Sequence, residues 1–233
     1  MEIYVVKIID INSEQLDELS LLIDSRKRHR IEKYVKKKNK LQTLIGEILL
    51  RAIIIQKLKI NNKDIVFSNN YYGKPYLKNH PNVFFNLSHS GEFVVCAFDE
   101  HPIGIDIEQI KEIEYEDLAK NFFTKREYDY IMKNDLDRKL NKFYDIWTLK
   151  ESYIKCCGKG LSLSLKSFSI EINGLKEINV IKGCSYTNHK LQILDFEFGY
   201  RMAICTLNKK KFPYIKTINQ SELIDTYKTL YNV

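Results

Sequence analysis

Four short segments from the first half of the chain recur in the second half, in the same order. The pairs are IIDIN at 8–12 with GIDIE at 104–108, DSRKRHRIEKY at 24–34 with FTKREYDYI at 123–131, TLIGEILLRAI at 43–53 with WTLKESYIKCC at 147–157, and GEFVVCAF at 91–98 with GYRMAICTL at 199–207. Their starting points lie 96, 99, 104 and 108 residues apart, and small insertions account for such a steady increase. We therefore expect two similar halves, residues 1–104 and 105–233, with the functional site in the cleft between them, because pockets gather at domain interfaces.

The pattern of apolar residues predicts both helices and strands. Residues 13–24, 39–58 and much of 116–156 have helical spacing, and Asn39 is a suitable N-cap for the second of these segments. The expected strands are VFFNLSHS, EFVVCAFD and PIGIDIE in the middle of the chain, and SFSIEI, LQILDFEF and YRMAICTL near its end. Interleaved strands and helices indicate an α+β or α/β fold.

Composition excludes several classes of protein. Of the 233 residues, 44% are apolar and 29% are charged, which is typical of a globular chain with a sizeable core. The start, MEIYVVKIID, lacks the basic region and long apolar run of a signal peptide, and the most apolar stretch, ILLRAIIIQ, is too short to span a membrane. Five cysteines without a C-x-x-C spacing favour reduced thiols, so we expect a cytoplasmic protein with no membrane partner.

A dense basic segment lies early in the chain. Residues 26–40, RKRHRIEKYVKKKNK, hold nine Lys or Arg residues and one acidic residue, Glu32, in a chain of net charge +7. Such a run attracts phosphate groups, nucleic acid or an acidic protein, but it is equally typical of a solvated helix face. On charge alone, both interpretations stay open.

The segment GIDIE places two carboxylates on one face of a strand. Side chains alternate along a strand, so Asp106 and Glu108 point to one side while Ile105 and Ile107 point to the other. Two like charges this close are unfavourable unless one is protonated or a cation lies between them. An oxygen-only pair suits Mg²⁺ or Mn²⁺. The alternative is an ordinary polar strand face exposed to water.

A third acidic position follows on a predicted helix, within FYDIWTLKESYIK at 143–155. Trp147, Glu151 and Lys155 are spaced four residues apart and therefore line one helical face. Glu151 is a candidate third metal ligand, and Lys155 is a candidate phosphate contact. The alternatives are an ordinary Glu–Lys pair on the helix surface, worth about 0.2–0.5 kcal/mol, and a core position for Trp147.

These segments occur together with others in a characteristic order. The set is YGKPYL at 72–77, FNLSHSGEFVVCAFD at 85–99, PIGIDIE at 102–108, FFTKREY at 122–128 and FYDIWTLKESYIKCCGKGLSLSLKSFSI at 143–170. It resembles the Sfp-type 4′-phosphopantetheinyl transferases over nearly the whole chain. The pairing of G-[IV]-D-[IV]-E with a later W-x-x-K-E-[AS]-x-x-K is specific to that superfamily. The resemblance implies two pseudo-symmetric α/β halves with the active site between them.

The resemblance also implies a reaction and the residues that perform it. Members of the family transfer the phosphopantetheine arm of coenzyme A to a serine of a carrier protein and release adenosine 3′,5′-bisphosphate. By resemblance, Asp106, Glu108 and Glu151 bind Mg²⁺, or Mn²⁺, against the pyrophosphate, and Lys155 adds positive charge there. The attacking hydroxyl belongs to the carrier, and either Glu151 or a metal-bound water accepts its proton.

Matching positions further imply contacts to the nucleotide end of coenzyme A. The expected residues are Lys27, Arg30 and His89 at the 3′-phosphate, and Thr43, Lys74 and Ser88 around the nucleotide. A basic residue often precedes the threonine in relatives, whereas this chain has Gln42. One phosphate contact is therefore expected to be missing or to come from Lys40.

The expected protein partner is an acidic acyl or peptidyl carrier protein. It is predicted to dock on residues 111–123 and 158–166, because these segments flank the acids and are predicted to be irregular. We expect a monomer, since one chain supplies both halves. A metal-dependent nuclease or nucleic-acid binder is the main alternative, but the order of the motifs argues against it, and a non-catalytic module would require a missing metal ligand. The motifs do not distinguish carriers of fatty acid, polyketide or nonribosomal peptide synthesis.

Overall fold

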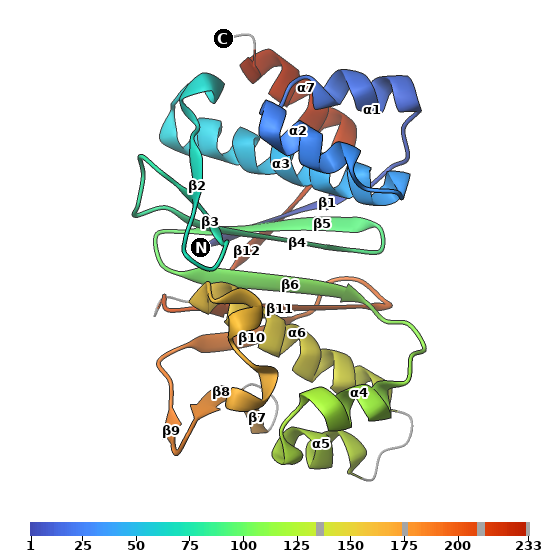
Figure 1. Cartoon of the computed structure of the whole chain (residues 1–233), viewed down its shortest axis with the longest axis vertical. Coiled ribbons are helices and arrows are strands. Elements are labelled where there is room, and N and C mark those ends of the chain that lie inside the picture. Colours follow the sequence, from blue (N-terminus) through green and yellow to red (C-terminus); the bar gives the residue numbers. More distant parts are fainter. Residues whose placement is uncertain (134–137, 174–176, 209–212, 232–233) are drawn as a thin grey trace.

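The computed structural model describes residues 1–133, 138–173, 177–208 and 213–231, and the predicted α+β class is confirmed (Figure 1). The first elements are β1 (Glu2–Lys7), α1 (Ser13–Ser20), α2 (Ser25–Glu32), α3 (Lys37–Leu58), η1 (Asn62–Asp64), β2 (Phe67–Asn69), β3 (Pro75–Leu77), β4 (Phe84–Ser90) and β5 (Phe93–Asp99). The later elements are β6 (Ile103–Gln109), α4 (Tyr115–Phe122), α5 (Lys125–Met132), α6 (Lys139–Cys157), η3 (Gly160–Ser162), η4 (Leu165–Ser167), β7 (Ser169–Asn173), β8 (Glu177–Lys182), β9 (Ser185–Tyr186), β10 (Lys190–Leu194), β11 (Tyr200–Thr206), β12 (Tyr214–Ile218) and α7 (Gln220–Tyr231).

The order of a strand, three helices and an antiparallel strand pair occurs twice along the chain. Three of the four repeated sequence segments fall on matching elements, namely α2 with α5, α3 with α6, and β5 with β11. The first segment does not, because residues 8–12 follow β1 instead of forming a strand like β6. The predicted boundary between residues 104 and 105 falls inside β6, and the division into two domains stays a prediction.

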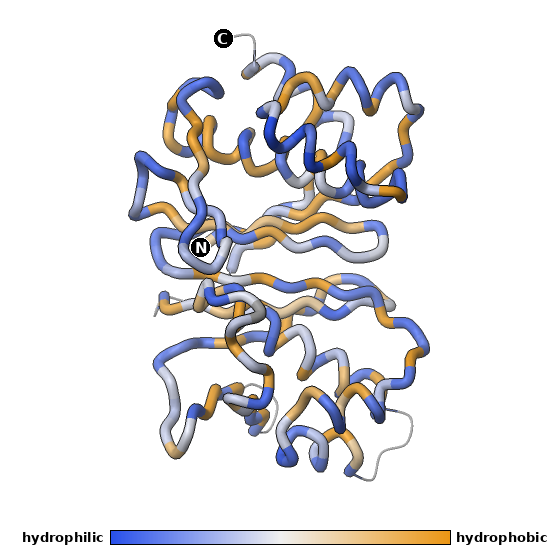
Figure 2. Tube along the Cα trace, viewed as in Figure 1, coloured by the Kyte–Doolittle hydropathy of each residue, from blue (hydrophilic) through white to orange (hydrophobic). Residues whose placement is uncertain are grey.

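Two sheets pack against each other in the middle of the molecule (Figure 1). One has the strand order β12-β1-β5-β4 and the other has the order β10-β11-β6. Because β12 pairs in parallel with β1, the end of the chain returns to the first sheet. Apolar side chains fill the space between the sheets, and Figure 2 shows the apolar residues concentrated along these central strands. The buried residues of this layer include Ile3, Val5, Phe93, Val95, Ile103, Ile105, Ile107 and Ile204.

Helices cover the outer faces of both sheets. α3 lies over the first sheet with α1, α2 and α7 around it, and α6 lies against the second sheet (Figure 1). The prediction that residues 116–156 are mostly helical is confirmed, since this segment contains α4, α5 and most of α6. The prediction of Asn39 as an N-cap is wrong, because α3 begins earlier, with Lys36 in the cap position and no capping side chain. Residues 111–123 are also not irregular as predicted, since they contain α4.

A buried ion pair fixes one face of α6. Lys150 Nζ donates to Glu127 Oε1 (2.5 Å) and to the carbonyl oxygen of Phe168 (2.9 Å), and both charged side chains are 0% exposed. Glu127 also accepts hydrogen bonds from the main-chain N–H groups of Thr124 and Ile170. An unpaired charge in so dry a place is costly, so this pair resists rotation of α6 about its axis. The orientation of the next residue, Glu151, follows from that of Lys150.

Two observations relate to the composition of the chain. Among the helices of the described segments, none has the length and apolarity needed to cross a lipid bilayer. All five cysteines lie in these segments and are unpaired.

Candidate active site

The alternation predicted for β6 is confirmed. Ile105 and Ile107 are buried between the two sheets, whereas Asp106 and Glu108 lie on the side of β6 that faces α6. Gly104 explains how closely the strand approaches the helix: a Cβ atom there would lie 2.1 Å from the carbonyl oxygen of Ser152. The absence of a side chain at this position therefore allows β6 to pack directly on α6.

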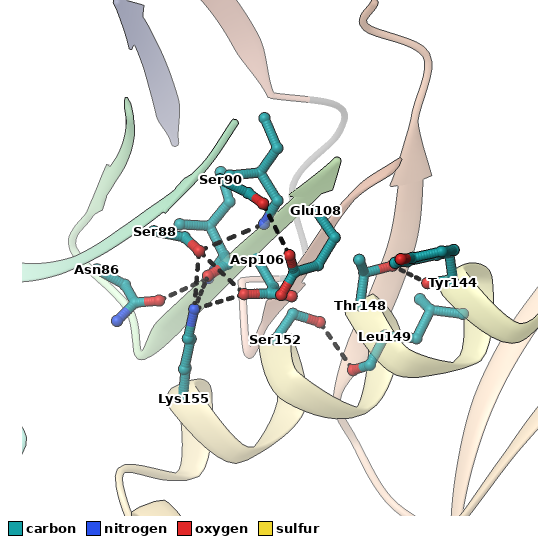
Figure 3. Close-up of polar contacts among 12 residues, drawn as sticks. Asn86, Ser88, Ser90, Asp106, Glu108, Tyr144, Thr148, Leu149, Ser152 and Lys155 are labelled. Atoms are coloured by element: carbon teal, nitrogen blue, oxygen red, sulfur yellow. Dashed lines mark hydrogen bonds and ion pairs between the residues drawn. The ribbon is translucent and has the colours of Figure 1, made fainter. Parts of the chain in front are cut away.

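Asp106 has one satisfied carboxylate oxygen and one that lacks a partner. Its Oδ1 accepts hydrogen bonds from Lys155 Nζ (2.6 Å) and Ser88 Oγ (2.9 Å) (Figure 3). Its Oδ2 is buried and has no hydrogen-bond partner among the described residues. Buried polar atoms are seldom left unpaired, so Oδ2 is suited to a ligand that is not part of the chain.

Glu108 lies beside Asp106 and is half-buried. Its Oε2 accepts a hydrogen bond from Ser90 Oγ (2.8 Å). Burial raises the pKa of Glu108 to about 7, and the negative charge of Asp106 contributes to this rise. The repulsion between the two neighbouring carboxylates is thus reduced in two ways. The ammonium group of Lys155 pairs with Asp106, and Glu108 holds its proton more tightly.

One cavity brings the predicted chemical groups together. It has a volume of about 360 Å³ and is lined by Leu87, Ser88, His89, Asp106, Glu108, Trp147, Glu151 and Lys155. Burial raises the pKa of Glu151, and the charge of Asp106 raises it further. Trp147 packs on Phe143 and Phe123, as expected for a core residue, but it also forms part of the cavity wall.

The chemistry of the cavity suits a hard divalent cation. The candidate donors are carboxylate oxygens, and Asp106 Oδ2 is free to bind. Within the described segments, however, no three His, Cys, Asp or Glu side chains lie close enough to hold an ion together. Without a bound cation, the carboxylates repel one another and are expected to stay apart. Asp106 Oδ1 is also paired with Lys155.

A second cavity, of about 340 Å³, opens between α3 and the end of β4. Its lining consists of Tyr34, Lys36, Lys38, Asn39, Gln42, Thr43, His89, Ser90, Gly91 and Lys111. His89 contributes to both cavities, so its ring connects the two. Burial lowers the pKa of His89, and the positive charges of Lys155 and Lys27 lower it further. The three lysines make this cavity attractive to an anion.

Several residues expected at the nucleotide end lie outside both cavities. Lys27 forms an ion pair with Glu47 (3.4 Å), and Arg30 is exposed on α2. The ammonium group of Lys74 donates to the carbonyl oxygens of Ile103 (3.0 Å) and Lys155 (2.6 Å), and burial lowers its pKa. In this structure Lys74 therefore links β6 to α6.

Gln42, which stands where the family resemblance implied a basic residue, has a structural function. Its side chain is 4% exposed, and Nε2 donates to the carbonyl oxygen of Gly91 (2.9 Å). Lys36, Lys38 and Lys111 line the second cavity instead, and none of the three had been predicted as a contact to the nucleotide. Lys36 and Lys38 belong to the basic segment 26–40, whose charge was a signal for phosphate binding. No local sequence pattern indicated a phosphate contact for Lys111.

Two protein-family models match consecutive parts of the chain. The model described as 4′-phosphopantetheinyl transferase, N-terminal, matches residues 11–101, and the model of the 4′-phosphopantetheinyl transferase superfamily matches residues 102–205. The 4′-phosphopantetheinyl transferase Sfp of Bacillus subtilis (strain 168) is 36% identical over 214 residues, which cover 92% of this chain and 95% of the relative. This chain belongs to the 4′-phosphopantetheinyl transferase superfamily.

The family predicted from the motifs is thereby confirmed, and so is the enzyme class, a transferase. A second phosphopantetheinyl transferase, gsp of Aneurinibacillus migulanus, is 36% identical over 202 residues, which cover 85% of this chain and 82% of the relative. Among solved structures, a holo-(acyl-carrier-protein) synthase from Bacillus anthracis str. Ames in complex with CoA (3′,5′-ADP) matches 45% of this chain at 19% identity, with a TM-score of 0.38.

Asn86 and Ser90 contact β6, the strand that carries two of the carboxylates, and neither had been predicted as a site residue. Asn86 Oδ1 accepts a hydrogen bond from Ile105 N (2.8 Å), and Ser90 Oγ bonds to both Glu108 and Gln109. The available signal was the spacing of Asn86, Ser88 and Ser90, since alternate residues of a strand point to the same side.

Proposed function

We propose that this chain transfers the 4′-phosphopantetheine group of coenzyme A to a serine hydroxyl of an apo acyl or peptidyl carrier protein. The pyrophosphate bond of coenzyme A breaks, a phosphodiester bond to the serine forms, and adenosine 3′,5′-bisphosphate leaves. The observation that carries the proposal is the gathering of Asp106, Glu108, Glu151 and Lys155 on one cavity, in a chain that aligns with Sfp over 92% of its length.

Asp106, Glu108 and Glu151 are proposed to hold Mg²⁺, for which Mn²⁺ can substitute. The support is the unpartnered, buried Oδ2 of Asp106 and the position of the other two carboxylates on the same cavity. When bound, the cation would neutralise charge on the pyrophosphate and on the leaving phosphate. Glu151 has to approach the other two acids, or the substrate has to complete the ligand set, because the three do not form a cluster in the described structure.

Lys155 and Glu151 are proposed as the catalytic side chains. Lys155 Nζ donates to Asp106, to Ser88 Oγ (3.0 Å) and to the carbonyl oxygen of Ile105 (3.2 Å), so its charge is held at the wall of the cavity. There it can stabilise the negative charge of a phosphate without moving far. Glu151 is the candidate base for the serine proton, since burial raises its pKa towards the range useful for proton transfer.

The second cavity is proposed to receive the nucleotide end of coenzyme A. His89 and Thr43 line it, and Ser88 lies at the neighbouring wall of the first cavity. Lys27 is close enough for its charge to lower the pKa of His89, which supports a shared phosphate contact. Arg30 is three residues further along α2 and is proposed to reach the same phosphate, whereas Lys74 is proposed to act through the β6–α6 packing.

The carrier is proposed to dock on residues 111–123 and 158–166, which contain α4 and two short 3₁₀ turns. These segments adjoin the strand and the helix that carry the carboxylates. The net charge of +7 favours an acidic partner. We further propose that the chain acts as a monomer in the cytoplasm, where its unpaired cysteines stay reduced.

The decisive experiment is the intact mass of an apo carrier protein after incubation with the enzyme, coenzyme A and Mg²⁺. The expected result is the gain of one phosphopantetheine group, with adenosine 3′,5′-bisphosphate in the supernatant. A carrier whose acceptor serine is replaced by alanine serves as the control and should gain no mass. An apo carrier that stays unmodified at any enzyme concentration would contradict the proposal.

A further inference from the structure

The two main sheets meet along β4 and β6, and among the described residues neither strand has a main-chain partner on this side. β4 ends the order β12-β1-β5-β4, and β6 ends the order β10-β11-β6. An edge strand presents a row of N–H and C=O groups, and where these groups are buried they must find other partners.

Side chains of β4 provide the partners for the N–H groups of β6. The three hydrogen bonds run from Ile105 N to Asn86 Oδ1 (2.8 Å), from Ile107 N to Ser88 Oγ (3.4 Å) and from Gln109 N to Ser90 Oγ (3.0 Å). Each pair is 19 residues apart in sequence, so the two strands run in the same direction. We call these three side chains the β4 ladder (Figure 3).

Lysine side chains satisfy two carbonyl groups on the same edge. Lys74 Nζ donates to the carbonyl oxygen of Ile103, and Lys155 Nζ donates to that of Ile105. Side chains thus replace a neighbouring strand at three N–H groups and two carbonyl groups of this edge of β6. The β4 ladder supplies the hydrogen-bond acceptors, and the two lysines supply the donors.

Two members of the β4 ladder also hold the carboxylates. Ser88 Oγ donates to Asp106 Oδ1 (2.9 Å), and Ser90 Oγ donates to Glu108 Oε2 (2.8 Å) (Figure 3). Each hydroxyl oxygen accepts a main-chain N–H of β6 and gives its own hydrogen to the acid. The same oxygen atom thus fixes the register of the strand and the direction of the carboxylate.

We propose that Asn86 and Ser90 are positioning residues for phosphopantetheine transfer, because they hold β6 in register with β4 and thereby fix Asp106 and Glu108 towards a bound metal ion. The inference rests on the proposed function. Asp106 and Glu108 lie on β6 of one sheet, whereas His89 lies on β4 of the other. The β4 ladder explains how the two carboxylates keep a constant position relative to His89. Removing a side chain that hydrogen-bonds to a metal-binding group typically weakens metal affinity by about 10–100-fold.

The test compares the purified full-length protein with Ser90→Ala, Ser90→Thr and Ser152→Ala variants. Mn²⁺ alone is the probe, and its dissociation constant is measured by electron paramagnetic resonance in the absence of coenzyme A. We expect Ser90→Ala to raise this constant by about tenfold or more and Ser90→Thr, which keeps the hydroxyl, to restore it. Ser152→Ala is the matched control, since among the described residues the hydroxyl of Ser152 bonds only to the Leu149 carbonyl oxygen within α6 (Figure 3).

Amide hydrogen exchange tests the ladder without metal. In the Ser90→Ala variant, the amide of Gln109 should exchange faster, while that of Ile105 should change little. In an Asn86→Leu variant, the amide of Ile105 should exchange faster, while that of Gln109 should change little. This variant should also weaken Mn²⁺ binding, although Asn86 contacts neither carboxylate, because it acts through the register of β6.

Equal Mn²⁺ dissociation constants in the wild-type, Ser90→Ala and Asn86→Leu proteins would overturn the inference and leave the proposed function intact. A wild-type protein that binds no Mn²⁺ would refute the metal assignment in the proposed function, and this inference with it. The inference would also be overturned if Ser152→Ala weakened Mn²⁺ binding as much as Ser90→Ala does. Such a result would indicate that both variants act through a general loss of packing.

Discussion

Replacing Glu108 by Gln should make the protein more stable at neutral pH and remove a pH dependence. Burial and the charge of Asp106 raise the pKa of Glu108 from 4.5 to about 7, so the folded state binds this proton more tightly than the unfolded state does. The free energy of unfolding therefore falls as pH rises between these two values. The penalty is absent below about pH 4.5 and complete above about pH 7.

The size of the effect follows from the two pKa values. A rise from 4.5 to about 7 corresponds to about 3 kcal/mol, because each tenfold change in a protonation equilibrium is about 1.4 kcal/mol. Glu108 is only half-buried, so solvent screening reduces this value to about 1–2 kcal/mol. Gln has the same shape and carries no charge. The variant should therefore gain about 1–2 kcal/mol over the wild type at pH 8 and little at pH 5.

The assay is urea unfolding, without metal ions, followed by the fluorescence of the single tryptophan, Trp147. The wild-type, Glu108→Gln and Glu100→Gln proteins are compared at pH 5 and pH 8, and the exposed Glu100 provides the control. Added Mg²⁺ should stabilise the wild type more than Glu108→Gln. If the wild type and Glu108→Gln differed by the same free energy at both pH values, the account of the two neighbouring carboxylates would be refuted.

Four further outcomes are expected. Asp106→Ala should lower the rate of carrier modification by several powers of ten, each worth about 1.4 kcal/mol. It should change the free energy of unfolding by less than about 1 kcal/mol, because the partly exposed Lys155 keeps two other acceptors. A large loss of stability would instead indicate that Asp106 is a structural acid. Lys150→Met should destabilise the protein by about 3–5 kcal/mol in thermal or urea unfolding, and adding Glu127→Gln should recover much of that loss. His89→Ala should raise the KM for coenzyme A more than it lowers kcat, and the reverse pattern would place His89 in the chemical step. The kcat/KM for an acidic carrier should fall with added salt, and a flat profile would argue against electrostatic steering.

Local sequence patterns determined the faces of the elements that carry the site. In GIDIE, strand alternation alone places Asp106 and Glu108 on one side and the isoleucines on the other, and the structure agrees. In the helix, the spacing of Trp147, Glu151 and Lys155 alone places them on one face, and all three line the cavity. These features were predictable because they depend on backbone geometry over a few residues.

The order of the motifs predicted the family, and a relative that is 36% identical over 92% of this chain confirms it. The boundaries of helices and strands were harder to predict from the sequence. Asn39 has the chemistry of an N-cap, yet α3 begins before it, and residues 111–123 form α4 where an irregular segment was expected. Weak local preferences at helix ends give way to the packing of the whole helix.

Only the tertiary structure decided what each charged side chain contacts. Lys155 pairs with Asp106, 49 residues away, and Lys74 reaches the carbonyl oxygen of Ile103, 29 residues away. The raised pKa of Glu108 likewise depends on burial, which no local pattern reveals. Ser90 meets Glu108 because β4 and β6, the edge strands of the two packed sheets, lie side by side. Such contacts join segments distant in sequence, and periodicity fixes the direction of a side chain but not the group that it meets.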